Sequence, residues 1–280
     1  MIGQKLLKIK FENLFEEKKL QRSILLVGPV GSGRRTFAKW MSSKLNYTFA
    51  EVGSSVDDVR ELITTSSKSF EPTLYVISDV DQLSSAAQNA LLKVLEEPPM
   101  SAYYVLTTTQ ESLVLSTIRS RCASYYMDTY SYEDLMVYAN TNYKSLLDSD
   151  IEEVIYNLCS CPGDIDLLLS QNVVDFMNYV NLVFNNIAKV SGANSFKISS
   201  KINLGNDNTK FDLVLFWRAF IYKCSVESDH IMDAKCCKYL KAISITTKYL
   251  QQLRIKGLNK QMAFDLWILD IRKAWMDAKD

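Results

Sequence analysis

The sequence has no excess of charge of either sign, which argues against one broad class of function. Its 280 residues include 32 lysines and arginines and 32 aspartates and glutamates. Proteins that bind nucleic acid through general electrostatics are usually basic overall. We therefore expect any contact with DNA to depend on a local patch or on a larger assembly.

Long apolar runs, paired cysteines and histidines are also scarce. The longest apolar run, Ile24–Val30, is far shorter than the ~20 residues that a membrane helix needs. The N-terminus lacks an apolar region of the secretory type. None of the six cysteines forms a Cys-x-x-Cys pair, and His230 is the only histidine. We expect a cytoplasmic protein without membrane contact, with reduced thiols and with a surface position for His230.

The remaining composition is that of a globular chain, with 48% hydrophobic and 23% charged residues, long enough for two or three domains. Short apolar runs alternate with helical patterns up to about residue 128. Strands are expected at 24–27, 47–52, 74–77, 102–106 and 123–127. Such alternation predicts a parallel sheet with helices on both faces. From residue 129 onward the pattern is helical, apart from the polar segment 191–210.

A glycine-rich turn follows the first expected strand and precedes a helix, which is the context of a P-loop. Gly28, Gly31 and Gly33 supply the turn. Arg34 stands where a working P-loop has lysine, and Arg35 stands where it has a serine or threonine that binds magnesium. Arginine does not replace lysine freely, and the lost hydroxyl removes a metal ligand. We interpret the loop as a turn kept for the fold, which leaves weak binding of ATP or ADP by its N–H groups open.

The stretch Asn89–Pro99 carries a resemblance to a known family. It reads as an amphipathic helix ended by two prolines. With the P-loop remnant, Gly3-Gln4 and the run from Thr117 to Cys122, it resembles the delta-prime subunits of bacterial or phage-encoded DNA polymerase III clamp loaders, which are AAA+ proteins. The resemblance covers about the first 170 residues. It implies an α/β P-loop AAA+ core at 1–128, a small helical lid at 129–172 and an all-helical collar for oligomerisation at 173–280.

The resemblance also places the residues that follow the third strand. Aligned on the helix, Ser78 takes the place of the aspartate that holds magnesium, and Asp79 takes the place of the glutamate that orients the attacking water. In the shifted register Asp79 is the metal carboxylate and Val80 replaces the glutamate. Either register lacks one acid, which argues against hydrolysis by this chain. Thr109 matches the sensor 1 position, with a plain polar strand end as the alternative.

Ser120-Arg121-Cys122 is the intact functional motif of the resemblance. An arginine supplied in trans can stabilise the charge of a phosphoryl-transfer transition state. The family's Ser-Arg-Cys motif supplies that arginine to the ATP of a neighbouring subunit, so Arg121 is the expected arginine finger. Arg119 is the competing candidate, and an ordinary surface arginine beside a cysteine that seals the core is the alternative.

Further along, Cys161–Asp166 resembles the start of sensor 2, where active relatives carry an arginine soon after the Gly-Asp pair. Asp166 stands near that place and would repel phosphate. We expect Asp164 to cap a helix N-terminus instead.

The polar side chains of the 89–99 helix region are candidates for contact with DNA. These are Gln88, Asn89 and Lys93, and a solvated helix face is the alternative. The resemblance implies as partners the ATPase and clamp-opening subunits of a clamp loader, a sliding clamp and primer-template DNA. No cysteine lies between Gly33 and Ser78, so the zinc module of many relatives is not expected, and no cofactor is required.

Three hypotheses follow. The first is a non-catalytic clamp-loader subunit that lends Arg121 to a neighbouring ATPase. The second is an active AAA+ motor subunit with atypical Walker motifs built on Arg34 and Asp79. The third is a DNA-binding or scaffold protein without clamp-loading partners, which the balanced charge disfavours.

Overall fold

The computed structural model describes residues 1–187, 198, 201–204, 210–229, 236–253 and 257–276. The chain forms two compact units. The first contains residues 1–138 with 160–163, and the second contains 139–159 with 164–280. This division does not set a 129–172 lid apart from a 173–280 collar, so the three-part division remains a prediction.

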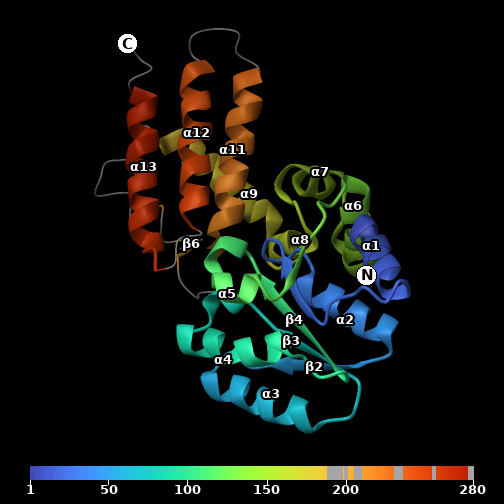
Figure 1. Ribbon diagram of the computed structural model, residues 1–280. Helices are drawn as coiled ribbons and strands as arrows, with labels where there is room; N and C mark the ends of the chain where they lie inside the picture. The colour runs from blue at the N-terminus through green and yellow to red at the C-terminus, as the bar shows by residue number, and fades with distance from the viewer. Residues whose placement is uncertain (188–197, 199–200, 205–209, 230–235, 254–256, 277–280) are drawn as a thin grey trace. The chain divides into compact units, whose positions relative to one another are not determined.

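A five-stranded parallel sheet, in the order β2-β3-β4-β1-β5, forms the centre of the first unit (Figure 1). Its strands are β1 (Ser23–Val27), β2 (Thr48–Val52), β3 (Thr73–Ile77), β4 (Ala102–Thr108) and β5 (Ala123–Tyr126). The three central strands are buried along their whole length. Strands covered on both faces read as continuous apolar runs rather than alternating ones. The predicted parallel sheet is confirmed.

Helices cover both faces of this sheet (Figure 1). They are α1 (Lys5–Glu16), α2 (Arg34–Leu45), α3 (Val56–Lys68), α4 (Ser85–Glu96) and the short α5 (Ser116–Arg119). Successive side chains of a strand point to opposite faces. Ile24 accordingly packs with Phe11 and Phe37 of α1 and α2, and Leu25 packs with Val59 and Leu91 of α3 and α4. The sheet therefore has one hydrophobic core on each of its faces.

The described part of the second unit is mainly helical. Helices in or entering this unit are α6 (Tyr132–Tyr143), α7 (Ser149–Leu158), α8 (Pro162–Leu169), α9 (Val173–Asn186), α11 (Leu213–Asp229), α12 (Cys236–Gln252) and α13 (Lys260–Met276). Helix α12 packs against both α11 and α13, as Figure 1 shows. Buried aromatic side chains such as Trp217, Phe220 and Trp267 fill the space between them.

The predicted helical character of the C-terminal region is confirmed for the described residues, with one addition: the short strands β6 (Ile202–Asn203) and β7 (Phe211–Asp212) pair in parallel. Strands of two residues are too short to show a period in the sequence. Pro162 begins α8, since proline suits the first helical position, where its missing N–H is not needed. The predicted polar segment 191–210 and His230 lie largely or wholly outside the described residues.

Helices suited to crossing a lipid bilayer are absent from the described part of the chain: none is both long and apolar enough.

Candidate functional site

The glycine-rich loop joins β1 to α2, which confirms its predicted context. Gly31 and Gly33 have φ angles of +79° and +82°, a region that residues with a Cβ rarely adopt. Gly33 is the N-cap of α2, whose first residue is Arg34. The N–H of Gly28 donates to the carbonyl oxygen of Thr108 at 3.1 Å. The loop is thereby fixed to the end of β4 as well as to its own strand.

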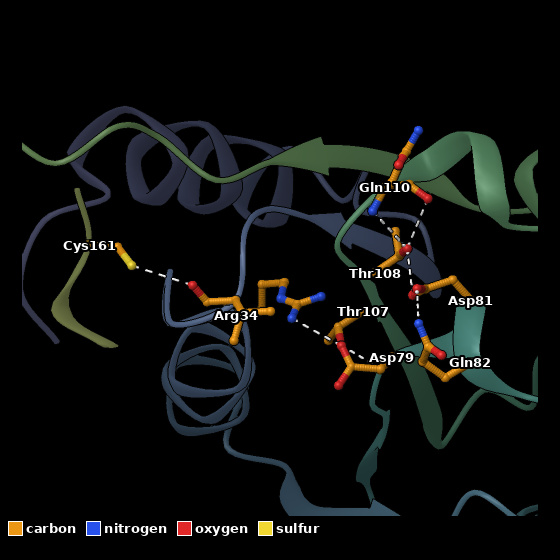
Figure 2. A network of polar contacts seen from close by, with 9 residues as sticks. Arg34, Asp79, Asp81, Gln82, Thr107, Thr108, Gln110 and Cys161 are labelled. Atoms are coloured by element: carbon orange, nitrogen blue, oxygen red, sulfur yellow. Dashed lines mark hydrogen bonds and ion pairs between the residues drawn. The ribbon is translucent and has the colours of Figure 1, made fainter. Parts of the chain in front are cut away.

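A second segment of the first unit covers this loop. The N–H of Gly163 donates to the carbonyl oxygen of Gly31 at 3.1 Å. A Cβ on Gly31 would lie 2.8 Å from the Cα of Gly163, so both positions need glycine. The Cys161 Sγ–H donates to the carbonyl oxygen of Val30 at 3.4 Å (Figure 2). This contact was not predicted from the sequence, in which Cys161–Asp166 only resembles the start of sensor 2.

Arg34 points across the opening of the loop toward the end of β3 (Figure 2). Its Nη2 atom lies 3.0 Å from Oδ1 of Asp79, with the arginine side chain 10% exposed and the aspartate side chain 50% exposed. The Arg34 Nη1 atom is buried and has no hydrogen-bond partner among the described residues. The cation at the lysine position is therefore paired with Asp79, which stands at the place of an active-site acid in either register.

Arg35 turns away from the loop. Its guanidinium makes a two-pronged ion pair with Glu51 on β2. Position 35 thus presents neither a hydroxyl nor a charge to a phosphate. With Ser78 in place of a carboxylate and Asp79 paired to Arg34, these side chains do not fit a magnesium nucleotide bound as in a working P-loop. Among the described residues, no group of three or more metal-ligating side chains is placed to hold a metal ion.

The ends of β3 and β4 are tied together by polar contacts (Figure 2). The backbone N–H of Asp79, which has a positive φ, donates to the hydroxyl of Thr107 at 3.0 Å. Asp81 lies in a short 3-10 turn, η1 (Val80–Gln82), and is 6% exposed. Its carboxylate accepts hydrogen bonds from the Thr108 hydroxyl at 2.8 Å and from the Gln82 amide at 3.0 Å.

Thr107 and Thr108 thus link the two strand ends, and the sensor 1 position of Thr109 stays a prediction. Thr108 is fully buried, and its hydroxyl also contacts the backbone of Gln110. The carboxylate and hydroxyl groups at these strand ends are used in hydrogen bonds within the chain. They would otherwise be free to bind a ligand.

Arg121 follows α5 and leads into β5. Its Nη1 donates to the carbonyl oxygen of Thr117 at 3.0 Å, and its Nη2 lies 3.3 Å from Oε1 of Glu96, at the end of α4. The arginine side chain is 30% exposed. The neighbouring Cys122 is buried, and burial raises the pKa of its thiol to about 12. The motif therefore joins a core cysteine to a partly exposed, oriented arginine.

Comparison with known proteins finds similarity to subunits of DNA polymerase III. Residues 49–131 match the family described as DNA polymerase III, delta subunit. The gamma subunit of Buchnera aphidicola subsp. Schizaphis graminum is 30% identical over 168 residues, which are 48% of this chain and 46% of that protein. The Bacillus subtilis tau subunit is 30% identical over 153 residues, 44% and 27% of the two chains. The Escherichia coli delta-prime subunit is 45% identical over 51 residues, 18% and 15%.

The chain is similar in sequence to the DNA polymerase III clamp-loader family. It spans less than half the length of these three relatives. Among solved structures, it resembles RuvB, a Holliday junction branch migration motor of Thermotoga maritima, with a TM-score of 0.51, 20% identity and coverage of 82% and 78%. A gamma-subunit-related protein of the same organism has a TM-score of 0.50 and 16% identity, and the match covers 95% of this chain and 99% of that protein. These similarities show an AAA+-like fold.

The three candidates for contact with DNA lie on different sides of α4. Asn89 and Lys93 are exposed. Gln88 is not: it is 5% exposed, its amide donates to the Leu83 carbonyl at 3.3 Å, and its Oε1 accepts from the Leu115 N–H at 3.2 Å. The prediction that Gln88 faces DNA is wrong, because Gln88 lies on the core side of the helix and satisfies backbone groups there.

In the second unit, the two acidic residues of the sensor 2 segment have partners within the protein. Asp164 lies in the first turn of α8, as expected of a capping residue, and is 7% exposed. Its carboxylate pairs with Arg218 of α11 at 2.7 Å. Asp166 accepts a hydrogen bond from the Tyr143 hydroxyl at 2.7 Å. Both carboxylates therefore serve packing between helices of this unit.

Proposed function

We propose that this chain is a clamp-loader subunit of the delta-prime kind. It does not hydrolyse ATP itself; it lends Arg121 to the ATP site of a neighbouring subunit and so helps to load a sliding clamp onto primed DNA in the cytoplasm. The observation that carries the proposal is the Arg34–Asp79 ion pair at the mouth of the P-loop. Its partners are the ATPase and clamp-opening subunits, the clamp and primer-template DNA.

The ion pair weakens any nucleotide site in this chain. To bind, a nucleotide phosphate would have to break the Arg34–Asp79 ion pair. Its metal ion would then lack the hydroxyl ligand that a working P-loop supplies at position 35. The backbone N–H groups of the loop remain as a site for weak binding of ATP or ADP. Neither zinc nor any other cofactor is required by this function.

Arg121 suits the donor role by its chemistry. Arginine stays charged at all relevant pH values and presents planar N–H donors that match phosphate oxygens. At 30% exposure the side chain is partly accessible from outside the chain. Arg119 is more exposed than Arg121 and lies at the end of α5, and it remains the competing donor.

The first test is nucleotide binding and phosphate release by the purified chain, with and without magnesium. We expect no turnover and weak or absent binding. The second test uses the chain assembled with the ATPase subunits of its own clamp loader. Arg121→Ala should abolish the clamp-stimulated ATPase while assembly is retained. Unchanged ATPase would refute the trans role of Arg121, and Arg119→Ala measured in parallel would show whether that residue is the donor.

A second candidate function is an active AAA+ motor subunit of the same loader. The observation that favours it is the length of similarity to gamma and tau subunits, which exceeds that to the delta-prime subunit. Magnesium-dependent phosphate release by the purified chain, abolished by Asp79→Asn, would establish this alternative.

The DNA contact is proposed for Asn89 and Lys93 alone. Both are exposed one turn apart on α4, and a lysine there can neutralise a DNA phosphate. Lys93→Glu should weaken the DNA-stimulated ATPase of the assembled loader and reduce its dependence on salt. Unchanged stimulation would mean that this face of α4 is merely solvated.

A further inference from the structure

Glu96 is the last residue of α4, and its carboxylate meets the guanidinium of Arg121. The contact joins two separate elements, because α4 and the turn after α5 are distant in the sequence. It sets Glu96 apart from its neighbour Glu97, which is exposed and has no ion pair within the described chain. The same helix end therefore offers one carboxylate that touches the arginine and one that does not.

The guanidinium of Arg121 is held from two sides. Thr117, one turn earlier in the chain, accepts from Nη1, and Glu96 lies beside Nη2. The Nε atom is buried without a hydrogen-bond partner among the described residues. An arginine has five N–H donors, two on each Nη atom. Each Nη atom therefore keeps one N–H beyond these contacts, which can serve a phosphate oxygen.

The contacts with Thr117 and Glu96 orient the guanidinium of Arg121 and still leave it accessible to a phosphate. The Glu96 side chain is 60% exposed, and solvent screens such a pair strongly. A screened pair restricts the directions that a long side chain takes, yet it cannot compete with the concentrated charge of a triphosphate. A contact strong enough to keep Arg121 away from a phosphate would need a buried partner, and Glu96 is not buried.

We infer that Glu96 is a positioning residue for Arg121: it fixes the direction of the guanidinium before the neighbouring ATP site closes on it. This inference rests on the proposed function, since it requires that Arg121 act in trans. It assigns the end of the α4 helix a part in the rate of ATP hydrolysis by the neighbouring subunit.

The test measures clamp-stimulated ATPase of the assembled loader containing the full chain. Glu96→Ala should lower kcat about fivefold and leave KM for ATP within twofold, because orientation matters for the transition state more than for ATP binding. Glu96→Gln, which keeps an oxygen acceptor on a side chain of equal length, should give an intermediate kcat. Glu97→Ala is the matched control and should match the wild-type chain. Arg121→Ala should cost about a thousandfold or more.

The double variant Glu96→Ala with Arg121→Ala decides whether Glu96 acts through the arginine. It should be no slower than Arg121→Ala alone, since a positioning residue has no effect once its target is gone. A wild-type kcat for Glu96→Ala beside an inactive Arg121→Ala, an increased kcat, or a loss of assembly that accounts for the lower rate would each overturn the inference alone. An unchanged rate for Arg121→Ala would instead overturn the proposed function.

Discussion

Arg34 and Asp79 face each other across the mouth of the P-loop, 3.0 Å apart. In a working site the first position would reach the phosphates and the second would hold the metal ion or the attacking water. Here each satisfies the charge of the other. The arginine at position 34 and the altered end of β3 are therefore linked through this ion pair. Restoring the working residue at only one of these positions would leave the other position altered.

The first prediction concerns the repair of the loop. Arg34→Lys combined with Arg35→Thr restores the lysine and the hydroxyl of a working P-loop, and we expect binding of ATP with magnesium to tighten at least about tenfold. Isothermal titration of the purified chain, with magnesium and with EDTA, measures the change. Arg35→Thr alone is the control, because it removes the pair with Glu51 but leaves Arg34 on Asp79. No gain in the double variant would mean that the side chains at 34 and 35 are not what limits binding.

The second prediction separates backbone strain from close packing at glycine. Gly31 and Gly257 have nearly the same φ, +79° and +80°, but among the described residues a neighbour lies where the Cβ would be only at Gly31. Replacement by alanine should cost about 1 kcal/mol at either position for the left-handed backbone. Gly31→Ala should cost about 1–3 kcal/mol more, because Gly163 cannot be displaced cheaply. Urea unfolding followed by circular dichroism compares the two, and equal losses would show that the loop yields.

The third prediction distinguishes two neighbours on α4. Gln88→Ala should destabilise the chain by about 1–3 kcal/mol, because it leaves the Leu83 carbonyl and the Leu115 N–H without their partner in a buried place. Asn89→Ala, one residue along on the exposed side, should change stability by less than about 0.5 kcal/mol. Thermal and urea unfolding of both variants provide the measurement. Similar values for the two would contradict the assignment of Gln88 to the core.

The fourth prediction concerns the thiols. Because burial raises the pKa of Cys122 to about 12, this cysteine stays protonated in the folded chain at pH 8.5. Iodoacetamide should modify the exposed Cys237 quickly and Cys122 only after unfolding in urea, as peptide mass spectrometry will show. In the unfolded chain the thiol ionises near its usual pKa of about 8.5. The stability that its protonated, buried form contributes is therefore complete below that pH and is lost as pH rises toward 12.

Equal labelling of the two cysteines in the folded chain would contradict this burial. In a Cys122→Ala variant, the part of the stability decline above pH 8.5 that the thiol causes should disappear. Declines caused by other groups should persist.

Much of the first unit could be predicted because its three central strands are buried on both faces. The expected strand at 24–27 corresponds to Ser23–Val27, and that at 74–77 to Thr73–Ile77. The strand expected to end at Leu106 instead continues through Thr107 and Thr108. Polar residues look like the end of a strand in sequence. Here the two hydroxyls are satisfied by Asp79 and Asp81, so they could be buried at no great cost.

The candidate site was predicted by residue type but not by partner. The sequence pointed to Arg34, Asp79 and Arg121, and it gave no sign that Asp79 or Glu96 would pair with an arginine. It also placed Gln88 on the polar side of a helix. Helical periodicity describes which residues are apolar, while a glutamine that satisfies two backbone groups enters the core without changing that pattern.

By itself, the sequence determined the alternation of buried strands and helices, the glycine turn and the loss of the lysine and hydroxyl that a P-loop uses. These depend on local properties: apolar runs, backbone freedom and side-chain type. Only the tertiary structure decided that Arg34 meets Asp79, that Gly31 meets Gly163 and that Glu96 meets Arg121. Each pair comes from different elements, and their meeting depends on how the strand ends and covering segments pack, which no local pattern specifies.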